Sequence, residues 1–87
     1  MKLNIEKAVE TYYSKFELSS KDIMDLLECS RTSAAALKKT AYKQQIEDGR
    51  KTFFASNVNT ESAYKSWGLD IGEIEKKYRK LKSLQNQ

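Results

Sequence analysis

The chain has 87 residues, of which 39% are hydrophobic and 32% charged, with no histidine, no proline and one cysteine. A chain of this length forms one small domain with a thin core, so we expect a single domain over residues 1–87. Without histidine there is no Ser-His-Asp triad, no Cys-His nucleophile pair and no histidine-containing zinc site, and one cysteine cannot form an internal disulfide. We therefore expect a protein that is not an enzyme and has no metal site, cofactor or small-molecule substrate.

The formal net charge of +4 is distributed unevenly along the chain. Residues 1–28 carry −2, residues 29–56 carry +4 and residues 57–87 carry +2. A basic middle third is typical of a nucleic-acid contact surface, although an ordinary lysine-rich surface gives the same count. The longest apolar run, residues 34–37, is too short to span a bilayer, and the charged N-terminus does not resemble a signal peptide. We expect a cytoplasmic protein that has no membrane segment.

Helix signals follow one another along most of the chain, because helix formers are abundant and proline is missing. Apolar spacing and capping residues predict four or five helices, at about residues 3–16, 20–28, 31–48, 61–67 and 71–85. Ser19 and Asp22 have the spacing of a capping box at the start of the second helix, and Gly49 is expected to end the third. A strand-like piece after Gly49 allows at most a minimal β-hairpin or wing around residues 51–58. The predicted fold is a small, mainly α domain.

Residues 20–48 have the pattern of a helix-turn-helix, in which two helices are joined by a turn of three or four residues. Ile23 and Leu27 lie on one face of the first helix and are expected to pack against Ala34 and Leu37 of the second. Cys29 is the small apolar residue in the turn between them. The second helix, about residues 31–47, is basic and is predicted to enter the major groove of DNA.

The segment Asp22–Lys39 resembles the helix-turn-helix of small regulators of phages and mobile elements, including excisionase-like proteins. That group shares a hydrophobic-small-hydrophobic turn pattern followed by Ser-Arg-x-Ser/Thr-Ala, matched here by Leu27, Cys29, Ser30–Ala34 and Leu37. Two positions depart from it, because Glu28 stands where a turn glycine is usual and Met24 where an alanine is usual. The resemblance implies a sequence-specific DNA-binding protein, either a transcriptional regulator or a recombination factor, with double-stranded DNA as its partner.

The predicted DNA contacts fall into two groups according to what each side chain can reach. Base edges are assigned to the start and outer face of the second helix, namely Arg31, Thr32, Ser33 and Ala36, because a guanidinium can bond guanine twice and short side chains let the helix approach. Phosphates are assigned to Ser19, Lys21, Lys38, Lys39, Lys43, Arg50 and Lys51. A solvated surface explains the lysines almost as well.

Two other surfaces leave alternatives open. Most aromatic residues are expected in the core, namely Tyr12, Tyr13, Phe16, Trp67 and Tyr78, whereas the pair Phe53-Phe54 is either core or an exposed tip. The last helix carries five basic residues around an apolar stripe, so it packs on the body, joins two copies in a homodimer or offers a second basic surface. The alternative function is a non-catalytic protein-interaction or adaptor module of phage origin that uses a helix-turn-helix-like bundle as its scaffold.

Overall fold

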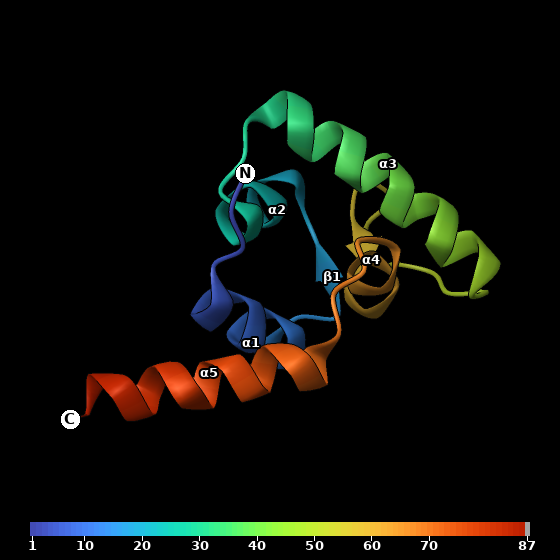
Figure 1. Ribbon diagram of the computed structural model, residues 1–87. Coiled ribbons are helices and arrows are strands. Elements are labelled where there is room, and N and C mark those ends of the chain that lie inside the picture. The colour runs from blue at the N-terminus through green and yellow to red at the C-terminus, as the bar shows by residue number, and fades with distance from the viewer. Residues whose placement is uncertain (87) are drawn as a thin grey trace.

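The computed structural model describes residues 1–86 and shows helices together with a very small antiparallel sheet (Figure 1). In chain order the elements are α1 (Ile5–Ser14), β1 (Glu17–Leu18), α2 (Ser20–Leu27), α3 (Arg31–Glu47), β2 (Val58–Asn59), α4 (Thr60–Ser66) and α5 (Ile71–Gln85). The predicted small, mainly α fold is confirmed. Among the helices of residues 1–86, none combines the length and the apolar character that a bilayer-spanning segment requires.

Each helix begins at a side chain that accepts a hydrogen bond from the backbone N–H three residues further on. These capping residues are Asn4, Ser19, Ser30, Asn59 and Asp70. The predicted capping box at Ser19 and Asp22 is confirmed, since each side chain bonds the backbone N–H of the other residue. At the far end of α3, Gly49 follows the last turn with a φ of 69°. Local sequence signals therefore place both ends of the helix pair.

α2 and α3 are joined by the three residues 28–30, which is the turn length of a helix-turn-helix. Ile23, Leu27 and Ala34 are buried in the core, and Leu37 packs at its edge and stays partly exposed. Glu28 adopts the left-handed conformation with a φ of 44°, at the position where the resemblance leads one to expect glycine. The predicted helix pair is therefore present, with its apolar contact weaker at Leu37 than expected.

The two-stranded sheet joins segments that are far apart in the sequence. Glu17 pairs with Asn59 and Leu18 with Val58, so the partner of β2 is β1. Residues 50–57 form a loop, and the strand-like piece predicted after Gly49 is not a strand. The reason is that the backbone N–H groups of this loop bond the side chain of Glu17 instead of a neighbouring strand.

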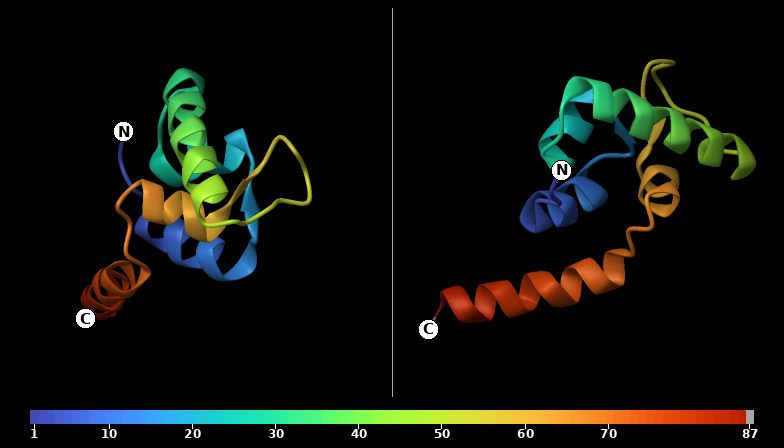
Figure 2. Two further views of the ribbon diagram at one scale, coloured as in Figure 1. Left: turned by 90° about the vertical axis from the view of Figure 1, so that its right-hand side faces the viewer. Right: turned by 45° about the horizontal axis from the view of Figure 1, so that its top comes forward.

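The core is centred on α4, which lies between α1 and α3 (Figure 2). Tyr64 is the largest fully buried side chain, and its hydroxyl donates to the carbonyl of Ala8 in α1 at 2.7 Å. Trp67 donates through Nε1 to the carbonyl of Leu37 in α3 at 3.0 Å. Burial raises the pKa of Tyr64, so its hydroxyl stays protonated and serves as a donor. These two bonds connect three helices through α4.

Several aromatic side chains lie at the surface, namely Tyr13 and Phe16, for which the prediction of a core position is wrong, and the pair Phe53-Phe54, which is the exposed tip rather than core. The exposed fractions are 66% for Tyr13, 92% for Phe16, 92% for Phe53 and 63% for Phe54. Phe16 is exposed because α1 already ends at Ser14, so the helical spacing that placed Phe16 inward does not extend to it. Tyr12 does face the core and packs on Tyr64 with ring centroids 5.2 Å apart.

Candidate nucleic-acid interface

The outward face of α3 is formed by the residues whose spacing places them opposite the core. Thr32, Ala36, Lys39 and Lys43 follow one another at intervals of four, three and four, and all four are exposed. On the opposite side of the helix Ala34, Ala41 and Gln45 are buried. Because these intervals keep side chains on one helix face, the four residues form a single stripe that runs along α3.

The first turn of α3 presents hydrogen-bond donors and contains no negatively charged side chain. Ser30 accepts a hydrogen bond from the N–H of Ser33 at 3.2 Å, and no acidic residue lies in this turn. Arg31, Thr32 and Ser33 are all exposed there. A guanidinium next to the positive end of the helix dipole favours an anionic or acceptor-rich ligand.

Three basic residues of α3 have no partner that would neutralise them. Within residues 1–86, Arg31, Lys39 and Lys43 take part in none of the ion pairs. Lys38 differs, because it is half-buried and its Nζ donates to Ser20 Oγ at 3.2 Å. Lys38 therefore links α3 to the start of α2, in addition to any contact with a ligand.

The N-terminus of α2 already holds a carboxylate. Ser19 donates through its N–H to Asp22 at 3.0 Å, and Lys15 donates to the same carboxylate at 2.7 Å. Burial raises the pKa of Asp22, but the hydrogen bonds from Lys15 and Ser19 outweigh it, so the pKa lies below its ordinary value. The predicted phosphate contact of Ser19 therefore competes with this carboxylate, whereas Lys21 is exposed beside it.

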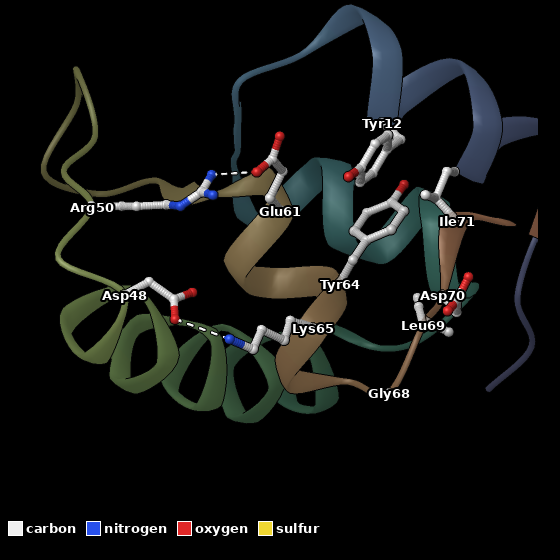
Figure 3. A pocket seen from close by; sticks show the side chains of 10 residues that line it. All are labelled: Tyr12, Asp48, Arg50, Glu61, Tyr64, Lys65, Gly68, Leu69, Asp70 and Ile71. Atoms are coloured by element: carbon white, nitrogen blue, oxygen red, sulfur yellow. Dashed lines mark hydrogen bonds and ion pairs between the residues drawn. The ribbon is translucent and has the colours of Figure 1, made fainter.

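Arg50 lies apart from the α3 stripe. Its guanidinium contacts Glu61 at 2.5 Å and Asn59 at 3.3 Å, on the side of the molecule where Tyr12 lies (Figure 3). Lys51 is exposed on the loop that follows. The structure thus places Arg31, Lys39 and Lys43 on α3, whereas Arg50 forms an ion pair with Glu61 of the same molecule.

The loop of residues 50–57 is held by the carboxylate of Glu17, which is not among the predicted site residues. Glu17 accepts from the N–H of Phe53 at 2.7 Å, from the N–H of Phe54 at 3.0 Å and from Nδ2 of Asn57 at 2.9 Å. The bond from Phe53 is the main reason why the pKa of Glu17 lies below its ordinary value. No local pattern could have predicted it, because Glu17 lies 36 residues before Phe53.

This clamped loop stands beside α3 and forms a cleft with it. The cleft has a volume of about 460 Å³ and is lined by Ala35, Lys38, Lys39 and Tyr42 of α3 and by residues 55–57 of the loop, among others. The loop therefore flanks the same helix that carries the basic stripe, and it presents Phe53 and Phe54 to solvent.

A second, larger pocket of about 570 Å³ lies at the junction of α1, α3, α4 and α5 (Figure 3). Four of its charged side chains form two ion pairs, because Lys65 pairs with Asp48 at 3.3 Å and Arg50 pairs with Glu61. Asp48 also accepts from Ser62 Oγ at 2.7 Å, and this bond is the main cause that holds the pKa of Asp48 below its ordinary value. These contacts fasten α4 to the end of α3.

Within residues 1–86, no three or more Cys, Asp or Glu side chains are gathered closely enough to hold a metal ion. Comparison of the chain with protein-family models, with curated proteins and with solved structures found no match.

Proposed function

We propose that the protein is a sequence-specific DNA-binding regulator of a phage or mobile element, acting in transcription or as an excisionase-like recombination factor. In this proposal α3 enters the major groove of double-stranded DNA. The observation that carries the proposal is the outward face of α3, where short side chains and unpaired cations follow one stripe. Thr32 and Ala36 let the helix backbone come close to base edges, and the cations supply attraction to phosphate.

The two ends of α3 have different tasks. Arg31 lies at the start of the helix, where a guanidinium can donate to both O6 and N7 of a guanine. Thr32 and Ser33 are exposed beside it and reach either bases or phosphate. Lys39 and Lys43 lie further along the stripe, where a helix that leaves the groove meets the phosphate backbone.

The test compares Arg31→Ala with Lys43→Ala in fluorescence anisotropy titrations against genomic fragments from the protein's own locus, at two salt concentrations. Arg31→Ala should weaken binding by roughly 1–3 kcal/mol and relax the preference at one base position. Lys43→Ala should weaken binding equally for all sequences and reduce the salt slope by about one unit. Lys7→Ala removes the same charge from an exposed position on α1 and is the matched control. Unchanged binding of both α3 variants at low salt would disprove the proposal.

The adaptor function is the second candidate, and the exposed pair Phe53-Phe54 favours it. Two adjacent phenylalanines at the surface of a loop that Glu17 holds in place form a preorganised apolar contact. The double change Phe53→Ser and Phe54→Ser separates the two functions. If the protein is an adaptor, the double variant should lose its protein partner in co-purification, and neither it nor the wild type should bind DNA. If the protein is a regulator, the double variant should bind DNA through α3 as tightly as the wild type does.

A further inference from the structure

α5 carries a dense group of cations outside the helix-turn-helix. Five basic residues lie within its residues 76–82, and all five are exposed, namely Lys76, Lys77, Arg79, Lys80 and Lys82. No acidic residue occurs after Glu75. We name residues 76–85 the basic half of α5. Its charge is concentrated on about 9 Å of helix axis, given a rise of 1.5 Å per residue.

The basic half extends beyond the body of the molecule. The first half of α5 packs on α1, where Ile74 is buried and the Tyr13 hydroxyl donates to Glu75. The two helices run in opposite directions, and the second half of α5 continues past the start of α1 (Figures 1 and 2). α3 lies on the other side of the molecule in the same views. The chain therefore carries its two basic helices on opposite sides of the molecule.

Contacts within α5 leave this charge available. Lys76 lies 3.6 Å from Glu73 and Arg79 lies 3.6 Å from the half-buried Glu75. Ion pairs whose cation is exposed contribute little at this distance. Lys82 lies over the ring of Tyr78 at 5.6 Å. Within residues 1–86, neither Lys77 nor Lys80 forms an ion pair. None of the five cations is therefore held in a strong ion pair, and together they attract a polyanion.

We infer that the basic half of α5 binds the phosphate backbone of a second DNA duplex, so that a molecule bound through α3 bridges two duplex segments. The bridge rests on the proposed function, whereas the binding of α5 to DNA does not. Duplex DNA carries about one negative charge per 1.7 Å of its axis, which matches the charge density of the basic half.

The charges also argue against two other occupants of this surface. Pairing of two basic halves in a homodimer would bring ten cations together, since each copy contributes five, and like charges at such spacing repel. A helix that lies in a membrane interface needs a wide apolar face. In α5 the cations are spread around the helix, and the apolar stripe between them is narrow. α1 already covers the first part of this apolar stripe, at Ile74.

The experiment captures a fluorescent random-sequence duplex on beads that carry a second, unlabelled random-sequence duplex, with the protein as the only link. The test variant is Lys77→Gln/Lys80→Gln/Lys82→Gln, and the matched control Lys77→Arg/Lys80→Arg/Lys82→Arg keeps the charge. Wild type and the arginine control should retain the fluorescent duplex. The glutamine variant should retain at least about 10-fold less of it. Circular dichroism checks that all three chains are equally helical.

Three results of the capture experiment would overturn the inference. The first is equal capture by wild type and the glutamine variant, and the second is no capture by wild type. The third is capture that rises with the square of protein concentration together with dimers in sedimentation, because pairs of molecules would then form the link. Phosphatidylserine vesicles and polyglutamate are tested in parallel, and binding of either through α5 in preference to the duplex would assign the surface to a membrane or an acidic protein.

Failure of the proposed function is distinguished by a variant of α3, Arg31→Gln/Lys39→Gln/Lys43→Gln. If α5 binds DNA independently, this variant still binds a random duplex with a salt slope of about two to three units, which disappears when the α5 glutamines are added. If binding of a random duplex vanishes in the α3 variant alone, the inference about α5 is wrong, and α3 alone carries the DNA binding that the proposed function requires.

Discussion

Glu28 is a residue whose backbone conformation suits another amino acid better. Within residues 1–86 it is the only non-glycine residue with a positive φ, at 44°. Left-handed backbone brings the Cβ of an L-residue close to its carbonyl oxygen, and glycine avoids this contact. The N–H of Cys29 still reaches the carbonyl of Met24 at 3.3 Å, so the turn closes as it would with glycine.

Glu28→Gly should therefore raise the free energy of unfolding by about 0.5–1 kcal/mol, because it relieves this contact at an exposed position. Urea denaturation of the wild type and the variant measures the change. Glu28→Ala removes the same carboxylate but keeps the Cβ, so it should stay close to wild type. A glycine variant less stable than the alanine variant would contradict the prediction.

Glu17 makes the stability of the protein depend on pH in the acid range. Its pKa is lower in the folded protein than the ordinary value of 4.5, chiefly because the N–H of Phe53 bonds the charged form. A lowered pKa contributes stability that is complete above the ordinary value and is lost as the pH falls through the folded pKa. Glu17→Gln should therefore be less stable at neutral pH and lose less stability between about pH 5 and pH 3. Thermal unfolding over this range tests it, with the exposed Glu10→Gln as control.

At the level of elements, the contact between α2 and α3 depends on a few buried side chains. Ile23 is fully buried, and Ala34 of α3 is buried in the same cluster. Ile23→Ala should cost about 2–5 kcal/mol because it leaves a cavity between the two helices. Leu37→Ala should cost clearly less, since Leu37 is already partly exposed. Chemical denaturation gives both values, and an equal loss would mean that Leu37 is as deeply packed as Ile23.

At the level of the whole molecule, α5 is attached chiefly through α1, whereas α4 packs against the centre of the core. Local opening requires less free energy where fewer buried contacts are broken. Backbone amides of residues 79–85 should exchange with deuterium at least on the order of 100-fold faster than those of α4. Exchange followed by mass spectrometry measures this, and equal protection of both segments would show that the basic half of α5 is held by contacts along its whole length.

Features that depend on neighbours within one helical turn follow from local spacing in the sequence. Ser19 with Asp22, and likewise Ser30 and Asp70, begin helices through hydrogen bonds to a residue three positions away, so spacing alone identifies them. The outward stripe of α3 follows in the same way, because helical periodicity separates Thr32 and Lys43 from the buried Ala34.

The packing of the whole chain sets which groups from distant segments meet. It places Glu17 against the loop that contains Phe53, pairs Arg50 with Glu61 away from the α3 stripe, and ends α1 early enough to expose Phe16. Composition and periodicity carry no information about such contacts. These contacts depend on how segments that are far apart in the sequence pack against each other. For this reason the helix pair and its basic face could be predicted, whereas the contact of Glu17 with the loop, the pairing of β1 with β2 and the placement of α3 and α5 on opposite sides of the molecule could not.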